Sequence, residues 1–183
     1  MWPVPRCGFG AIMTMVSPIQ KWPGLSLFLP VFCAVLIADQ ISKQIMLDLV
    51  FNPPRYIEIG LLLNIVPVWN SGISFGMLAD GGLVVRIGLT VLAFAVSGWF
   101  VWMLPKLDRL QQLAGAAIAG GAIGNAIDRL RFGRVVDFID FHIGAWHWPA
   151  FNVADAAITI GAGLWAYSIL FGQETNEHMI RQA

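Results

Sequence analysis

Four apolar runs constrain the fold of this chain more than any other feature. They cover residues 25–47, 83–104, 110–130 and 151–171, and each has 21 to 23 residues. A helix of that length is roughly 31–35 Å long, which is enough to cross the hydrocarbon core of a bilayer. Backbone polar groups inside a membrane need hydrogen bonds within the chain, so each run is expected to be helical. We therefore predict an all-α membrane protein with four transmembrane helices, formed by residues 1–183 as a single domain.

The composition supports a membrane location and excludes nucleic acid as a partner. Hydrophobic residues make up 57% of the 183 residues and charged residues only 12%, which is more apolar surface than a soluble domain of this size would bury. Eleven basic residues balance eleven acidic ones, so there is no basic excess to bind nucleic acid. The two cysteines, Cys7 and Cys33, have no zinc-type spacing.

The segments outside the spans are short. Residues 1–24 contain four prolines and no cleavage site after an apolar core, so we expect a flexible tail rather than a removable signal, with Met13 and Met15 as alternative starts. Residues 172–183 are expected to be a polar C-terminal tail. Between the first two spans, residues 56–66 show partial alternation with β-branched residues, which predicts a small β-platform. Residues 132–150 are expected to form a loop.

The third span is expected to lie at the centre of the bundle. Ala116, Gly120 and Gly124 follow one another at four-residue spacing, which lets helices approach closely in lipid. The alternative is that these small residues only reflect the general composition of membrane helices. The connection at residues 105–109 is so short that the second and third spans must be antiparallel neighbours.

An up-and-down arrangement of the spans brings the polar residues to one end of the bundle. Alternating directions place these six residues of the spans at the same side of the membrane: Asp39, Lys43, Arg86, Asp128, Arg129 and Asp155. The connections that carry Asn70 and Asp137 emerge at that side too. Ionisable groups at such positions are costly and are usually functional.

Local spacing offers structural explanations for some of these residues. Asp39 and Lys43 are four residues apart, so a simple ion pair within one helix is an alternative to a functional role. Asp128, beside Arg129, is expected to be ionised and paired, in a structural role.

Asn152 and Asp155 have the spacing of a helix N-cap and its third residue, so capping is an alternative for both. Capping alone does not explain why Asp155 is the only charged residue of its span. A helix N-terminus favours the ionised form of a carboxylate, which suits a general base.

Asp137 and Asp140 supply further carboxylates in the segment that follows the third span. If this segment is extended, the two point to opposite faces, so only one of them is expected to join the site. Two carboxylates held close together share a proton, and one can then activate a water while the other donates a proton, as in aspartic peptidases.

Other catalytic chemistries lack the residues that they need. His142 and His147 lie near Asp140, but there is no His-Glu-x-x-His pattern, so we expect no metal. Ser42 is adjacent to Lys43, and neighbours on a helix point apart, so a Ser-Lys pair is not expected.

Five ordered blocks of sequence carry a resemblance to a known family. The chain resembles signal peptidase II, the bacterial lipoprotein signal peptidase, over about residues 25–171. The blocks are Asp39-Gln40-x-x-Lys43, Asn70-x-Gly72-x-x-Phe75-Gly76, Gly124-Asn125-x-x-Asp128-Arg129, Gly133-x-Val135-Val136-Asp137-Phe138 and Phe151-Asn152-x-Ala154-Asp155.

The resemblance implies an aspartic endopeptidase that removes signal peptides from prolipoproteins, cutting just before a diacylglyceryl-modified cysteine. It implies that Asp137 and Asp155 are the catalytic pair. Because Asp155 lies at a helix N-terminus, we expect it to be the base and Asp137 the acid, with roles that can exchange within a cycle. The residues expected to bind substrate are Asp39, Lys43, Asn70, Asn125, Arg129 and Asn152. Structural support is expected from Asp128, Asp140, Gly72 and Gly124.

The resemblance also implies a location and partners. We expect a monomer in the bacterial inner membrane, without cofactor, in contact with lipids and with lipid-modified prolipoproteins. The β-platform, the loop and the active site would face the periplasm, and both termini the cytoplasm. The basic residues outside the spans favour this orientation weakly, with five on the side of the termini (Arg6, Lys21, Lys106, Arg109, Arg181) and three on the other (Arg55, Arg131, Arg134).

Two other classes of protein make different predictions. A proton-coupled transporter or channel subunit would need ionisable residues through the thickness of the bundle, whereas here they gather at one end. A non-catalytic scaffold would tolerate replacement of Asp137 and Asp155.

Overall fold

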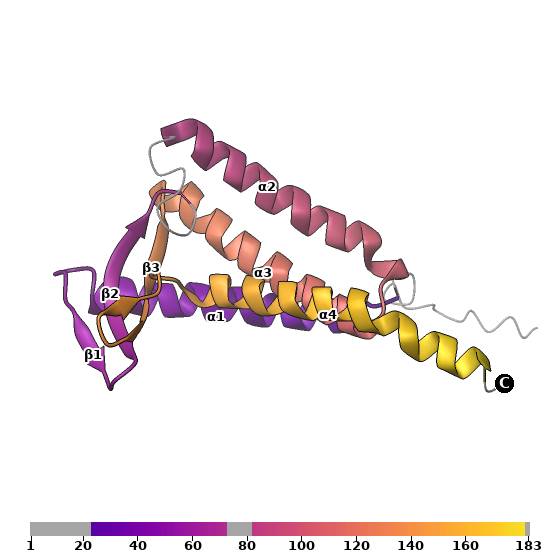
Figure 1. Cartoon of the computed structure of the whole chain (residues 1–183). Coiled ribbons are helices and arrows are strands. Elements are labelled where there is room, and N and C mark those ends of the chain that lie inside the picture. The colour runs from indigo at the N-terminus through magenta and orange to yellow at the C-terminus, as the bar shows by residue number, and fades with distance from the viewer. Residues whose placement is uncertain (1–22, 73–81, 182–183) are drawn as a thin grey trace, which may run out of the picture.

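Four helices form the body of the protein, and a small sheet lies at one end of them (Figure 1). The computed structural model describes residues 23–72 and 82–181, with side chains as far as residue 171. The predicted flexible tail at 1–24 therefore lies almost entirely outside the described residues, as does the end of the glycine-bearing segment after Gly72. The helices are α1 (Leu25–Leu49), α2 (Gly82–Met103), α3 (Arg109–Phe132) and α4 (Val153–Arg181), and a 3-10 turn (Leu104–Lys106) follows α2.

Each helix coincides with a predicted span. Among the described residues, three stretches are long and apolar enough to cross a membrane: Leu25–Leu49, Gly82–Lys106 and Val153–Phe171. The third predicted span is also helical, but glycine, alanine and polar residues replace larger apolar ones along α3, so its own hydropathy does not mark it as spanning. The polar C-terminal tail predicted at 172–183 is helical as far as Arg181, because α4 continues past the predicted span.

The helix α3 lies between α2 on one side and α1 and α4 on the other (Figure 1). A Cβ atom at Gly120 would come within 2.9 Å of the carbonyl oxygen of Phe32 on α1. On the α4 side, a Cβ atom at Gly161 would come within 2.8 Å of the carbonyl oxygen of Ala114. Only glycine permits backbones to approach so closely, which confirms the predicted close packing of the third helix.

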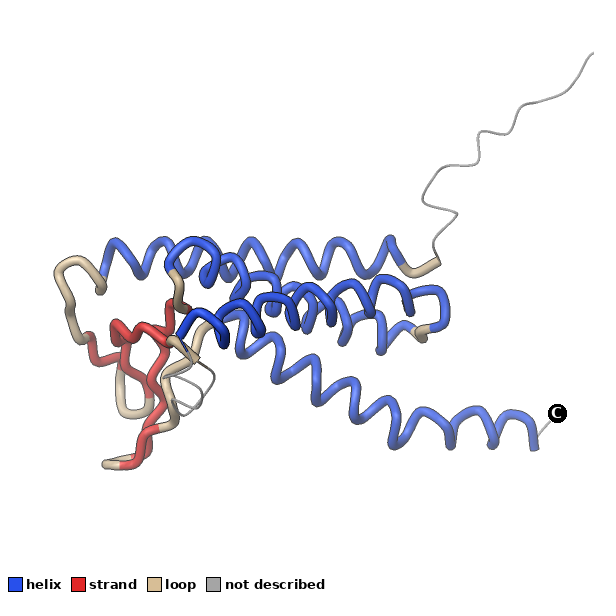
Figure 2. Tube along the Cα trace, turned by 90° about the horizontal axis from the view of Figure 1, so that it is seen from above, coloured by secondary structure: helices blue, strands red, loops and turns tan. Residues whose placement is uncertain are grey.

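The four strands form one antiparallel sheet in the order β1-β2-β3-β4, gathered at one end of the helices (Figure 2). The strands are β1 (Ile57–Ile59), β2 (Leu63–Asn70), β3 (Val135–Ile143) and β4 (Trp146–His147). The β-platform predicted at 56–66 is confirmed. The prediction of a loop at 132–150 was wrong, because β3 pairs along β2 and finds its hydrogen bonds there, in a segment more than 60 residues earlier.

The end of α3 determines where β3 begins. Gly133 has a φ of 76°, in the left-handed region, and its N–H donates to the carbonyl of Arg129. This C-cap stops the helix, as glycine commonly does. Two residues later β3 starts, and the backbone N–H of Val136 donates to Oδ2 of Asp128 at 3.1 Å. The strand therefore leaves the helix in a fixed direction and carries Asp137 towards the bundle.

Candidate active site

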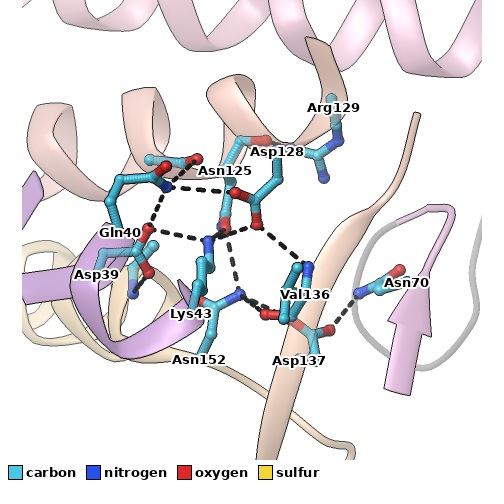
Figure 3. Close-up of polar contacts among 12 residues, drawn as sticks. Asp39, Gln40, Lys43, Asn70, Asn125, Asp128, Arg129, Val136, Asp137 and Asn152 are labelled. Carbon is cyan, nitrogen blue, oxygen red and sulfur yellow. Dashed lines mark hydrogen bonds and ion pairs between the residues drawn. The ribbon is translucent and has the colours of Figure 1, made fainter. Parts of the chain in front are cut away.

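Lys43 lies at the centre of a buried polar cluster that joins α1 to α3 (Figure 3). Its Nζ is 2.9 Å from Oδ2 of Asp39 and 2.9 Å from Oδ2 of Asp128, and it donates to Oδ1 of Asn125 at 2.8 Å. The ion pair predicted within α1 is confirmed, but it is one part of a network between two helices. The ion-pair partner of Asp128 is Lys43 rather than the adjacent Arg129, because neighbouring residues on a helix point about 100° apart.

Gln40 and Asp39 extend this cluster to the start of α4. Gln40 Nε2 donates to Asp39 at 3.1 Å and to Asp128 at 3.2 Å. Asp39 Oδ1 accepts the backbone N–H of Ala154 at 2.9 Å, so a carboxylate from α1 lies at the N-terminus of α4. Gln40 was missed as a site residue because it carries no charge, although it stands in the same sequence block as Asp39.

Asp137 is a buried carboxylate on β3 that accepts two side-chain amide hydrogen bonds. Asn70, at the end of β2, donates to its Oδ2 at 2.9 Å, and Asn152 donates to its Oδ1 at 2.7 Å (Figure 3). Burial, together with the nearby charge of Asp155, raises the pKa of Asp137 to about 6, although both amides favour its ionised form. This carboxyl group therefore keeps its proton to a higher pH than an ordinary aspartate does.

Asp155 is held by one side chain of α3 and by the start of α4. Asn125 Nδ2 donates to its Oδ1 at 2.8 Å. The backbone N–H of Asp155 donates to Asn152 Oδ1 at 2.9 Å, and the backbone N–H of Asn152 donates to Asp155 Oδ2 at 3.2 Å. These two bonds are a reciprocal capping arrangement, so the capping alternative is correct for both residues. The same residues also lie in the cluster, because Asn152 contacts Asp137 as well.

Asp140 faces away from this cluster. It accepts a hydrogen bond of 2.8 Å from Asn64 on β2 and lies 2.9 Å from Nδ1 of His147 on β4. As expected for an extended segment, the two side chains leave β3 on opposite faces, and of the two only Asp137 contacts the cluster. Asn64 was missed; its position within an otherwise apolar strand was the available signal.

Arg129 and the glycines complete the walls of the site. Arg129 donates to the carbonyl of Gly72 at 3.0 Å and to that of Asn125 at 3.4 Å, and its Nε is buried without a partner among the described residues. A Cβ atom at Gly124 would collide with Oδ2 of Asp39. Every site residue predicted from the sequence, except Asp140, thus lies in or against one connected cluster. A cavity of about 390 Å³ opens beside Arg129, Asn125 and Asp155.

Comparison with known protein families places this cluster in context. Residues 31–171 match the family model described as signal peptidase (SPase) II. The chain belongs to the signal peptidase II family. The matched range runs from α1 into α4 and contains every polar residue described above, so family membership and the observed geometry concern the same part of the molecule.

Individual members of the signal peptidase II family are similar over most of their length. The lipoprotein signal peptidase of Paraburkholderia phymatum is 43% identical over 160 residues, which cover 85% of this chain and 96% of that protein. The lipoprotein signal peptidase of Burkholderia thailandensis is 41% identical over 154 residues, covering 83% and 89%. A solved structure described as a bacterial membrane enzyme has a TM-score of 0.69 and 29% identity, covering 84% of this chain and 92% of that one.

Proposed function

We propose that this protein is an aspartic endopeptidase that removes the signal peptide from prolipoproteins, cutting just before a diacylglyceryl-modified cysteine. Asp137 and Asp155 are the catalytic pair in this proposal. The observation that carries it is the contact of one side chain, Asn152, with both residues: its amide donates to the Asp137 carboxylate and its carbonyl accepts from the Asp155 backbone. Membership of a peptidase family supports the reaction class.

The two carboxyl groups have environments that suit different roles. Asp137, with a pKa raised to about 6 by burial and by Asp155, takes up a proton more readily than an ordinary aspartate and is the acid. Asp155 lies in the first turn of α4, where the helix N-terminus favours negative charge, and it accepts from Asn125 at 2.8 Å. Asp155 is therefore the base.

The reaction proceeds by attack of water on the scissile peptide. Asp155 takes a proton from the water, whose oxygen bonds to the carbonyl carbon while Asp137 gives its proton to the carbonyl oxygen. The resulting diol collapses as the C–N bond breaks. Asp155 then returns its proton to the leaving nitrogen, and Asp137 recovers one from a hydroxyl of the diol, so both groups end as they began.

The remaining polar residues bind substrate or hold the pair in place. Asn70 and Asn152 fix Asp137, Asn125 fixes Asp155, and Arg129 presents a buried donor to the substrate. Lys43 joins two buried carboxylates to Asn125, which keeps α1 and α3 in register at the site. Asp39 and Asp128 act through Lys43, and Asp140 supports the far face of the sheet through Asn64.

We place the active site at the periplasmic side of the inner membrane, with all four helices crossing and both termini in the cytoplasm. The packing of α3 between the three apolar helices supports its crossing, because its polar and small residues are then shielded from lipid. Among the described residues, the buried carboxylates Asp39, Asp128, Asp137 and Asp140 all lie at the sheet end. A proton-coupled transporter would need such groups along its whole depth, so the arrangement favours a peptidase.

The proposal is tested by cleavage of a diacylglyceryl-modified prolipoprotein by the purified full-length protein. We expect Asp137→Asn and Asp155→Asn each to reduce turnover at least about a thousandfold, in line with the loss of an acid or base. Asp48→Asn is the matched control, because Asp48 is an exposed aspartate at the end of α1 on the same side of the bundle. Near-normal turnover by either variant of the pair would show that the assignment is wrong.

A further inference from the structure

The cavity beside Arg129 continues as an apolar channel between α2 and α4, with α3 as its back wall. Its polar lining lies at the sheet end, where Asn70, Asn125, Arg129 and Asp155 meet. Away from that end it is lined by aliphatic side chains, among them Leu92 and Val96 of α2, Ile118 of α3 and Ile158 of α4. Leu92 lines the channel and is 56% exposed, so this side of the channel is in reach of bilayer lipid.

An aromatic cluster closes the other end of this channel. The ring of Trp165 on α4 lies 5.1 Å from that of Phe100 and 5.9 Å from that of Trp99, both on α2. Phe100 is buried and packs directly against Gly115 of α3. These three residues continue the same helical faces that line the channel, since Phe100 is four residues beyond Val96 and Trp165 is seven beyond Ile158. The cluster therefore bridges α2 and α4 immediately below the cavity.

The distance from the candidate base to the aromatic cluster indicates what can occupy the channel. Trp165 is ten residues beyond Asp155 along α4, which corresponds to roughly 15 Å. A signal-peptide helix that spans the membrane needs about 30 Å and would run into the cluster. An acyl chain of a single leaflet begins at the headgroup level and extends over about half of the hydrocarbon core, which is the length available here.

The polar end of the channel suits the ester groups of a lipid. Arg129 is 9% exposed, lines the cavity and has a buried Nε–H without an acceptor among the described residues. An unsatisfied buried donor is unfavourable by about 1–3 kcal/mol, so a bound acceptor is expected. An ester carbonyl supplies an acceptor without adding charge beside Asp155.

We propose that this channel binds one acyl chain of the substrate's diacylglyceryl group, and that Trp99, Phe100 and Trp165 limit the length of chain that it accepts. The inference rests on the proposed function, because it deepens the description of the same substrate. It assigns a specificity role to three residues that lie about half a membrane away from the reacting peptide and contact none of the polar site.

The first experiment measures kcat/KM for prolipoprotein peptides that differ only in acyl-chain length. Moving a methylene from lipid into an apolar channel gains packing contacts but no hydrophobic transfer energy, so we expect a modest rise in kcat/KM while the channel is filling and a fall where the cluster is reached. We expect Trp165→Ala to move this reversal to longer chains. Val96→Trp, which fills the channel above the cluster, should move it to shorter chains and lower kcat/KM for long chains about tenfold or more.

Matched controls separate a length effect from general damage. Trp102→Ala removes an exposed tryptophan from the same end of α2, and Val84→Trp adds one at an exposed position of that helix; both should keep the wild-type dependence on length. If Trp165→Ala does not fold, Val96→Trp still tests the proposal, because its larger side chain fills space that is already present in the channel. An unchanged length dependence in Val96→Trp, with normal cleavage, would overturn the channel assignment and leave the peptidase proposal intact.

The second experiment detects binding without cleavage. A prolipoprotein peptide with a photoreactive group at the end of one acyl chain is cross-linked to full-length Asp137→Asn protein in a bilayer, and the labelled residues are mapped. Labelling of Trp99, Phe100 or Trp165 supports the proposal. Labelling only at lipid-facing positions elsewhere overturns it, whether or not the wild-type protein cleaves the peptide, so failure of the two proposals can be told apart.

Discussion

Asn152 donates a hydrogen bond of 2.7 Å from its side-chain amide to Oδ1 of Asp137, the shortest of the contacts that hold this carboxylate. The carbonyl oxygen of the same side chain accepts the backbone N–H of Asp155. Because Asn152 is fully buried, neither bond has water as a ready substitute. One side chain thus fixes a strand carboxylate relative to the first turn of a helix.

Replacement of Asn152 is therefore expected to impair catalysis more than folding. Its amide stabilises the negative charge that Asp137 acquires when it gives up its proton. A hydrogen bond to a charged group contributes about 1.5–3 kcal/mol, so Asn152→Ala should lower kcat about 10- to 100-fold. The control is Asn64→Ala, which removes a comparable bond of 2.8 Å to Asp140 on the opposite face of β3. Steady-state kinetics with both variants check this, and equal losses of kcat would mean that the effect is structural.

Cleavage is expected to weaken as the pH rises through the pKa of Asp137. Its pKa is raised to about 6 by burial and by the charge of Asp155, and the acid must be protonated to act. The Asn70 amide favours the ionised form, so Asn70→Ala should raise this pKa and move the alkaline limb of kcat/KM to higher pH. A limb that moves to lower pH in Asn70→Ala, or moves equally in Asp48→Asn, would contradict the assignment.

The same shift in pKa makes a prediction about stability. The folded pKa of Asp137 lies above the roughly 3.9 of an unfolded aspartate, so its favourable contribution is complete below about pH 3.9 and is lost as pH rises through about 6. At pH 8, Asp137→Asn is therefore expected to be more stable than wild type, by up to about 3 kcal/mol. Thermal unfolding of both proteins in detergent at pH 5 and pH 8 measures this difference, which should be largest at pH 8.

Lys43 is expected to be essential for stability, and an apolar residue of the same length should not be able to replace it. Lys43→Met leaves Asp39 and Asp128 buried without a cation, which should lower the free energy of unfolding by about 3–5 kcal/mol. Adding Asp128→Asn should restore part of the loss by removing one unpaired charge. Lys106→Met, at an exposed lysine, is the control and should change stability by no more than about 0.5 kcal/mol. If the second substitution does not restore any stability, the unpaired charges are not the cause of the loss.

Position 124 is not expected to tolerate even a methyl side chain in place of glycine. An added Cβ would meet Asp39 Oδ2, so Gly124→Ala should displace the carboxylate from the start of α4 and cost about 1–3 kcal/mol. Gly88→Ala is the matched control, because a Cβ there meets nothing within 4 Å; it should be neutral or stabilising, since alanine favours a helix. Melting temperatures and cleavage rates of the two variants would show the contrast, and similar behaviour would count against the close packing.

Much of the fold could be predicted because apolar runs of membrane length permit few structures. The helices α1, α2 and α3 begin and end within two residues of the predicted spans, and the small residues of α3 predicted its close packing. The strand β3 was missed because its pairing partner is β2, which is far away in sequence, and no local sequence pattern predicts such a pairing.

The candidate site was predicted through its charges, and its uncharged members show the limit of that approach. Asp39, Lys43 and Asp128 attract notice because charges are rare in an apolar chain. Gln40 and Asn64 are common polar residues whose role depends on the carboxylates that they reach across the bundle. Lys43 also pairs with a second carboxylate besides Asp39. The identity of that second partner depends on how α1 packs against α3, which local spacing does not specify.

The contact between Asp39 and the backbone of Ala154 joins residues 115 positions apart, in the first and last helices. During synthesis the ribosome delivers Asp39 first and Ala154 long afterwards, so the carboxylate is inserted into the membrane before its partner exists. The start of α4, which carries Asp155, receives this hydrogen bond only after residue 154 has been synthesised and has packed against α1. Under the proposed function, a growing chain whose last helix has not yet packed lacks a complete pair of aspartates, and we expect it not to cleave signal peptides at the site of insertion.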